Sequence, residues 1–208
     1  WWPVPDLDED ALVQALLAVG TSPLGPLAGG RTLATIAPAD SLRELDFELP
    51  LSGGDLARGT GARTGTAPVV LGDLAPLLRA HLPEGDPVRS YAAVLDADAA
   101  LAGQPLRGYL GGSVDVLLRL RGAGGDRHGN EVDRYVVVDY KTNWLGPHGD
   151  AAPPLLASTY RPEAMEAAMA GSDYPLQALL YAVVAHRFLR WRLRDYDPGV
   201  HLGGVLYL

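Results

Sequence analysis

Two aspartates and a lysine have residue types and spacing suited to joint chemistry. Asp139 and Lys141 lie in the segment VVVDYK, at the end of an apolar run. Because alternate residues of a strand point to the same face, we expect these two side chains to share one side. Asp115 lies in GGSVDV, on the preceding predicted strand and beside two glycines. Antiparallel pairing of the two strands would bring Asp115 near Asp139.

Carboxylates that lie close together need a cation, because two bare carboxylates a few ångströms apart repel each other. Oxygen ligands of this kind suit Mg²⁺, which takes one or two carboxylates together with substrate phosphate. A neighbouring lysine can position water or stabilise the charge that develops on the phosphate. The set Asp115, Asp139 and Lys141 therefore indicates metal-dependent phosphodiester hydrolysis. D-x-K on its own is a weak signal, and its alternative interpretation is an exposed salt bridge.

The lysine is unusual within this composition. Of the 17 basic residues, 16 are arginine and one, Lys141, is lysine. Lysine is a compact point charge whose pKa can move, whereas arginine stays protonated. The retention of lysine at this one position favours a chemical role, although chance is the alternative.

A long predicted helix supplies a second layer of polar side chains. Tyr174, Gln177 and Tyr181 stand at i, i+3 and i+7, so they share one helix face. This face could hold DNA backbone or orient the lysine. Alternatively, the tyrosines are ordinary half-buried aromatic residues.

These residues must be positioned by a mixed order of helices and strands. Periodicity predicts strands over 43–50, 107–121, 134–141 and 201–208. Helices are predicted over 7–19, 72–82, 88–102, 161–170 and 172–196, and residues 52–68 read as a surface loop. The order predicts an α/β fold around one sheet. We expect residues 1–42 to form a helical and loop segment that leads into a core over 43–208.

Composition narrows the function class. The 208 residues are 48% hydrophobic and 20% charged, as in a globular domain, and they include no cysteine, which excludes disulfides and zinc–thiolate sites. The net charge of −8 disfavours a general DNA-coating protein. We expect a cytoplasmic protein with no membrane segment. Because the chain lacks an initial Met, we interpret it as part of a longer polypeptide.

Other catalytic signatures are absent from the sequence. It has no GxxxxGK[ST] loop for an ATP-driven motor and no GxSxG or HExxH motif for other hydrolase classes.

Four segments together resemble the C-terminal nuclease domain of RecB, the beta subunit of exodeoxyribonuclease V. They are GGSVDV, VVDYKTNWLG, YPLQALLY and DYDPGVHLGGVLYL, and the resemblance runs from about Arg43 to Leu208. It implies a restriction-endonuclease-like core of the PD-(D/E)XK class, with a central mixed β-sheet flanked by helices. It also implies Mg²⁺, single-stranded DNA delivered by a helicase, and RecC-like and RecD-like partner subunits.

The resemblance assigns roles residue by residue. Asp115 and Asp139 correspond to the metal-binding acids, and Lys141 corresponds to the catalytic lysine. The backbone carbonyl of Tyr140 is an expected extra metal ligand, and Glu44 resembles the upstream acid. Gln177 and Tyr181 match a Q-x-x-x-Y helix motif, which Tyr174 precedes on the same face.

One departure bears on activity. The family also has a metal-binding histidine upstream of the core, and no histidine of this chain matches it, because His81 follows Glu44 rather than preceding it. The competing hypothesis is therefore a silent nuclease-like domain that is retained for assembly or DNA binding.

Overall fold

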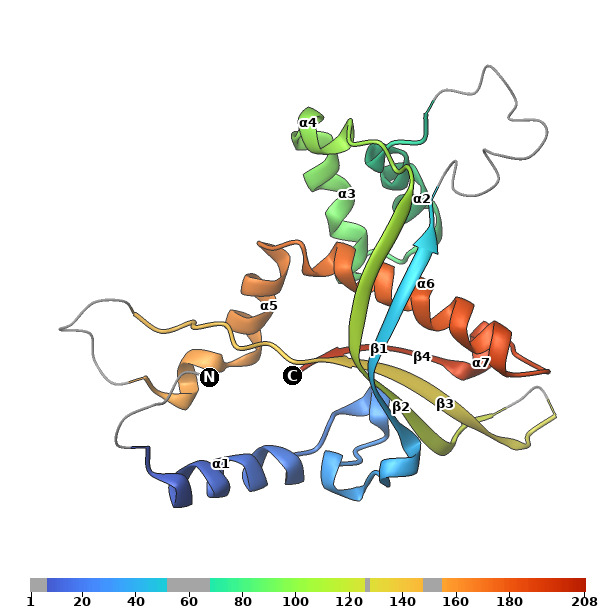
Figure 1. Cartoon of the computed structure of the whole chain (residues 1–208). Coiled ribbons are helices and arrows are strands. Elements are labelled where there is room, and N and C mark those ends of the chain that lie inside the picture. The colour runs from blue at the N-terminus through green and yellow to red at the C-terminus, as the bar shows by residue number, and fades with distance from the viewer. Residues whose placement is uncertain (1–6, 52–67, 126–127, 148–154) are drawn as a thin grey trace. The chain divides into compact units, whose positions relative to one another are not determined.

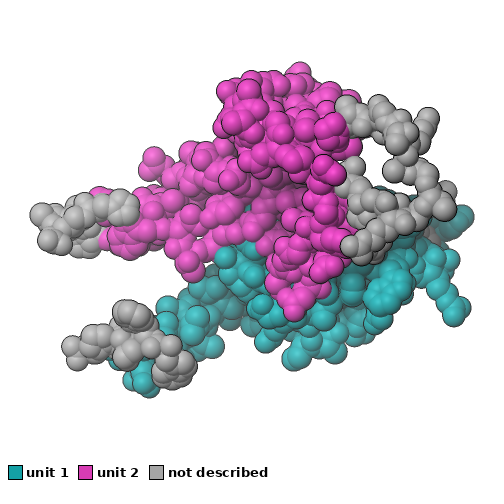
Figure 2. All heavy atoms as spheres, turned by 45° about the horizontal axis from the view of Figure 1, so that its top comes forward, with its two compact units in different colours: residues 1–45, 114–140, 185–208 teal, residues 46–113, 141–184 magenta. Residues whose placement is uncertain are grey.

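The computed structural model describes residues 7–51, 68–125, 128–147 and 155–208. The chain divides into two compact units, which Figure 2 shows in different colours. Unit 1 contains residues 1–45, 114–140 and 185–208, and unit 2 contains residues 46–113 and 141–184. The predicted boundary between residues 42 and 43 stays a prediction.

A four-stranded sheet is the central element (Figure 1). Its strands are β1 (Ser41–Pro50), β2 (Tyr109–Gly125), β3 (Glu131–Asp139) and β4 (Leu202–Tyr207), in the order β1-β2-β3-β4. β2 pairs with β3 antiparallel, and β3 pairs with β4 parallel. The sheet is therefore mixed and flanked by helices, which confirms the predicted α/β class and agrees with a restriction-endonuclease-like core.

The core of unit 1 forms because β2 and β3 place apolar side chains on one face at every second residue. These residues pack with turn residues from the N-terminal segment; the buried cluster is Leu24, Ala28, Val116, Leu118, Leu120, Val136 and Val138. Unit 1 also contains α1 (Glu9–Thr21), α7 (Pro198–His201) and three 3₁₀ turns at Pro26–Ala28, Leu33–Thr35 and Pro38–Asp40.

A buried carboxylate joins the last of these turns to β2. Asp40 accepts hydrogen bonds from Arg119 Nε at 2.6 Å and from Arg121 Nε at 2.8 Å. The bond from Arg121 is the main reason that the pKa of Asp40 lies below its ordinary value, and Arg119 adds to the effect. This ion pair anchors the turns before β1 to the sheet.

Unit 2 is mainly helical. It contains α2 (Leu74–His81), α3 (Pro87–Ala97), α4 (Ala99–Ala102), α5 (Pro162–Ala170) and two 3₁₀ turns at Leu71–Asp73 and Ala157–Tyr160. The long helix α6 (Tyr174–Arg192) begins in unit 2 and ends in unit 1. Its start is held in unit 2, where the buried Tyr91 of α3 donates a hydrogen bond to Asp173 at 3.1 Å. Burial and this carboxylate raise the pKa of Tyr91 to about 12.

Several element ends differ from the predictions for identifiable reasons. The helix predicted over 88–102 is interrupted at Asp98, whose carboxylate accepts hydrogen bonds from the backbone N–H groups of Ala100 and Leu101 and so starts a second helix. β2 continues to Gly125, beyond its predicted end at 121, and the loop predicted over 52–68 falls largely outside the described residues. Within the described ranges, no helix has the length and apolar character that crossing a bilayer requires.

Candidate active site

The two aspartates lie opposite each other at one end of the β2–β3 ladder. Val116 pairs with Val138 and Leu117 pairs with Val137, so one further step along the same register places Asp115 opposite Asp139. Residues directly opposite in an antiparallel pair project to the same face, with neighbouring Cβ atoms. Asp139 is only 4% exposed, whereas Asp115 is half-buried. The two carboxylates therefore share a face of the sheet, where β3 ends.

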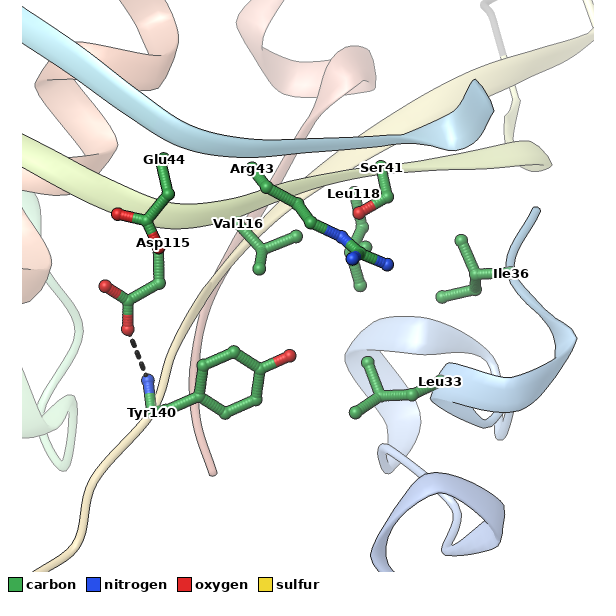
Figure 3. Close-up of a pocket in the computed structure, with 9 residues that line it drawn as sticks. All are labelled: Leu33, Ile36, Ser41, Arg43, Glu44, Asp115, Val116, Leu118 and Tyr140. Atoms are coloured by element: carbon green, nitrogen blue, oxygen red, sulfur yellow. Dashed lines mark hydrogen bonds between the residues drawn. The ribbon is translucent and has the colours of Figure 1, made fainter. Parts of the chain in front are cut away.

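The backbone beside Asp139 is fixed from two directions. The N–H of Tyr140 donates a hydrogen bond to Oδ2 of Asp115 at 2.8 Å, as Figure 3 shows. On the side of β4, the N–H of Leu208 donates to the carbonyl of Asp139 at 3.1 Å. These bonds hold the carbonyl of Asp139 and the amide of Tyr140 in defined places.

This arrangement corrects the predicted end of the strand. The apolar run suggested a strand over 134–141, but β3 ends at Asp139. The amide of Tyr140 is bound by the side chain of Asp115 and not by a carbonyl of the ladder, so regular pairing stops. Lys141 consequently lies beyond the strand, and strand alternation does not set its direction.

Glu44 has an uncommon backbone conformation. Its φ is +49°, the one positive φ at a non-glycine residue in the described part of the chain. This left-handed conformation costs energy for a residue with a Cβ atom and interrupts the alternation of β1. As a result, the neighbours Arg43 and Glu44 both line a cavity that Asp115 and Tyr140 also line (Figure 3).

This cavity lies entirely within unit 1 and has a volume of about 330 Å³. Its apolar wall consists of Leu33, Ile36, Val116 and Leu118. All four belong to the core cluster of unit 1 or pack against it, so the wall is part of the folded core. Sequence reasoning missed the cavity, because Leu33 and Ile36 come from a turn about 80 residues before Asp115 and no motif marks them.

In unit 2, the amine of Lys141 is held by two residues of α6. Its Nζ donates a hydrogen bond to Oε1 of Gln177 at 2.8 Å and lies 4.4 Å from the ring centre of Tyr174. The amide of Gln177 donates to the hydroxyl of Tyr181 at 3.0 Å, and that hydroxyl donates to the carbonyl of Ser113 at 3.3 Å. The predicted helix face thus contacts the lysine. Hydrogen bonds through Gln177 and Tyr181 connect the lysine to the backbone of β2 at Ser113.

The loop after Lys141 is tied to the same helix face. The hydroxyl of Tyr174 donates a hydrogen bond to Oδ1 of Asn143 at 2.8 Å. The carbonyl of Asn143 in turn accepts a hydrogen bond from the hydroxyl of Tyr160 at 2.9 Å. The ring that lies over the lysine amine is therefore itself held at its far end.

The groups that could hold a divalent metal ion are all oxygen donors. They are the carboxylates of Asp115 and Asp139 and the backbone carbonyl of Tyr140. Within the described residues, no group of three or more histidine, cysteine, aspartate or glutamate side chains is placed to hold a metal. Two carboxylates suffice for Mg²⁺ when substrate phosphate supplies further ligands.

The histidines contribute elsewhere. His186 Nδ1 lies 3.1 Å from the hydroxyl of Tyr196, and His201 Nδ1 lies 2.9 Å from the carbonyl of Asp197. Both contacts lie within unit 1. His148 lies outside the described residues.

Comparison with known proteins adds to this geometry. Two proteins called RecBCD enzyme subunit RecB, from Mycobacterium tuberculosis (strain ATCC 25618 / H37Rv) and Mycolicibacterium smegmatis, are each 51% identical to the whole of this chain. Over its whole length, the chain is thus homologous to a segment of RecB. The RecB of Escherichia coli is 31% identical over 200 residues, or 96% of the chain.

The match concerns one part of RecB. The chain spans 17% of the length of the mycobacterial RecB proteins and 13% of the E. coli protein. No family model matches the chain. The relatives thus show that the chain is related to one segment of RecB, and they assign no role to individual residues.

Proposed function

We propose that this chain is the nuclease domain of a RecBCD-type helicase–nuclease. In this proposal it hydrolyses DNA phosphodiester bonds, with Mg²⁺, during double-strand-break repair and the degradation of foreign DNA. The observation that carries the proposal is the placement of Asp115 and Asp139 opposite each other on one face, with Lys141 two residues later in the chain.

The donor set fits Mg²⁺ on chemical grounds. Asp115, Asp139 and the Tyr140 carbonyl would hold the ion, and their hard oxygen atoms are of the kind that it prefers. When bound, the ion supplies positive charge to phosphate oxygens and makes a coordinated water more acidic. The burial of Asp139 agrees with this fit, because a bound cation would offset the cost of placing carboxylate charge away from water.

Lys141 has a distinct role in this proposal. Its ammonium group would donate hydrogen bonds to the attacking water or to the phosphate as negative charge develops there. Gln177 and Tyr174 restrict where the amine can lie, and such positioning is what electrostatic stabilisation requires. Glu44 would add negative charge beside Asp115 and help to orient water.

The partners follow from the names of the relatives. A RecBCD enzyme subunit RecB is by its name part of a RecBCD enzyme. We propose that the full-length protein of this chain assembles with RecC-like and RecD-like subunits. These would deliver single-stranded DNA to the site.

A second candidate is a nuclease-like domain without activity. It is favoured by the absence, among the described residues, of a third metal-ligating side chain beside the two aspartates. On this alternative the acidic pair serves assembly or DNA binding only. The two candidates differ in whether a divalent ion binds at Asp139.

The test is Mg²⁺-dependent degradation of end-labelled single-stranded DNA by the full-length protein in its complex. Asp115→Ala, Asp139→Ala and Lys141→Ala are each expected to reduce the rate at least about a hundredfold. Asp133→Ala is the matched control, because Asp133 lies on the same strand but away from Asp139. It accepts a hydrogen bond from the N–H of Gly122, and its carboxylate lies 4.0 Å from Nε of Arg119.

Calorimetry separates the candidates. The nuclease proposal predicts a Mg²⁺ or Mn²⁺ binding signal that Asp139→Ala removes and Asp133→Ala retains. If the wild-type complex degrades DNA and the Lys141→Ala complex does so equally fast, Lys141 has no part in the reaction. If the wild type neither binds metal at this place nor cuts DNA, the silent domain is the correct interpretation.

A further inference from the structure

The cavity that Asp115 and Tyr140 line has one apolar side and one polar side. One side is apolar, formed by Leu33, Ile36, Val116 and Leu118. The other side carries the Asp115 carboxylate and the ring of Tyr140, which is 47% exposed. Its volume of about 330 Å³ lies in the range of pockets that bind small ligands.

The charged side chains that line this cavity are Arg43, Glu44 and Asp115. Arg43 lines it and forms no ion pair with any residue in the described part of the chain. A guanidinium group binds phosphate oxygens well. Asp115, the proposed metal ligand, lines the same cavity, so a base inside it would lie next to a phosphate at the metal.

The backbone of β1 gives a second indication. Arg43 and Glu44 are consecutive, and in a regular strand they would point to opposite faces. The positive φ of Glu44 places both in the cavity lining at an energetic cost. Conformational strain of this kind persists where the surroundings enforce it, often at ligand sites.

We propose that this cavity binds the nucleotide next to the bond that is cut. Its base lies against the ring of Tyr140 and the apolar wall, and Arg43 contacts a backbone phosphate. Stacking on an aromatic ring is available to every base, so this subsite holds single-stranded DNA without reading its sequence. This inference rests on the proposed function and deepens it by assigning the place of the substrate base.

The first experiment maps the base by photocrosslinking. The full-length protein in its complex is bound to an oligonucleotide of 5-iodouracil in Ca²⁺ without ATP, and it is irradiated and digested for mass spectrometry. A crosslink on the peptide that contains Tyr140 is expected. It should persist in Tyr140→Phe, which keeps the ring, and disappear in Tyr140→Leu. Tyr109→Leu is the matched control, because Tyr109 is also 47% exposed and lies outside the cavity.

The second experiment measures cleavage of oligo(dT) and of the same oligonucleotide with abasic sites, in Mg²⁺. Tyr140→Leu is expected to raise KM for oligo(dT) roughly five- to a hundredfold, the size of one base stack. It should leave KM for the abasic substrate nearly unchanged, and Tyr140→Phe should behave like the wild type.

Failure of this inference is distinguishable from failure of the proposed function. The subsite is wrong if Tyr140→Leu affects cleavage of both substrates equally, or if the crosslinks fall outside the Tyr140 peptide. The proposed nuclease function still holds in either case if Asp139→Ala abolishes cleavage. If Asp139→Ala cleaves like the wild type, the proposed function itself is wrong. Thermal melting of Tyr140→Leu checks that the variant is folded, and the Tyr140→Phe crosslink tests the subsite independently of that result.

Discussion

The Nζ atom of Lys141 lies 2.8 Å from Oε1 of Gln177, and this hydrogen bond places the lysine by means of a helix rather than a strand. The same amine lies 4.4 Å from the ring centre of Tyr174, on the same face of α6. Because Lys141 lies after the end of β3, these contacts take over the positioning that strand geometry would have supplied.

The first prediction therefore concerns Gln177 as a positioning residue. Gln177→Ala is expected to lower kcat of DNA cleavage roughly ten- to a hundredfold with little change in KM, because the amine becomes free to leave its productive place. The measurement is steady-state cleavage with the melting temperature determined in parallel. Gln14→Ala on the exposed α1 helix is the control. A Gln177→Ala enzyme with normal kcat would show that the hydrogen bond is only structural.

The second prediction concerns the positive φ of Glu44. Glycine adopts a positive φ without strain, so Glu44→Gly is expected to raise the free energy of unfolding by about 0.5–1 kcal/mol while it lowers nuclease activity. Glu48→Gly, at another exposed position of β1, should instead lower the free energy of unfolding by about 0.5–1 kcal/mol. Urea-induced unfolding measures both changes. A loss of stability in Glu44→Gly would argue that the carboxylate itself stabilises the fold.

The strands and helices that the sequence predicts well are those in which burial determines the pattern of apolar and polar residues. The run Val136–Val138 is fully buried and reads as a central strand, and the hydrophilic Asp139 marks its end. The face that Tyr174, Gln177 and Tyr181 share follows from helical spacing alone. Local patterns suffice in both cases because the interactions repeat along a single element.

Features that depend on contacts between distant segments could not be predicted. The end of β3 is set by a hydrogen bond from Tyr140 to Asp115, 25 residues earlier in the chain. The positive φ at position 44 could not be predicted, because the residue there is glutamate and not glycine or asparagine. Leu33 and Ile36 line the cavity from a separate turn. The roles assigned to Asp115, Asp139 and Lys141 stay predictions for the experiments above.

The third prediction is a pH dependence of stability from Asp40. Its pKa is lowered in the folded protein, chiefly by the hydrogen bond from Arg121, so the ionised form stabilises the fold. This contribution is fully present above the unfolded-state pKa, which is close to the ordinary value of 3.8, and is lost as the pH falls through the lower folded-state pKa.

Asp40→Asn should thus be less stable than the wild type from pH 5 to 7, and the difference should shrink below about pH 4. Urea-induced unfolding over pH 3–7 measures it. Asp195→Asn, which changes an exposed aspartate of the same unit, should show a much smaller difference at every pH. A gap between Asp40→Asn and the wild type that stays constant down to pH 3 would contradict the assignment.

The last prediction concerns the β-bulge in β4 at Gly203, where β4 pairs with β3. Tyr135 pairs with Leu202 and Val136 pairs with Gly204, so Gly203 is an extra residue between them. A Cβ atom on Gly203 would lie 2.6 Å from Cγ2 of Val136 and 2.8 Å from the carbonyl oxygen of Tyr135. Backbone is one of these two neighbours, so the clash cannot be relieved by a side-chain rotation alone.

Gly203→Ala is therefore expected to lower the free energy of unfolding by about 1–3 kcal/mol. It should also reduce DNA cleavage, because β4 ends at Tyr207 and the N–H of the next residue, Leu208, donates a hydrogen bond to the carbonyl of Asp139. Gly125→Ala is the control, since a Cβ atom there would meet no atom within 4 Å. Urea-induced unfolding and the cleavage assay measure the two effects. A Gly203→Ala protein that loses stability but cleaves DNA at the normal rate would show that the position of Asp139 does not depend on β4.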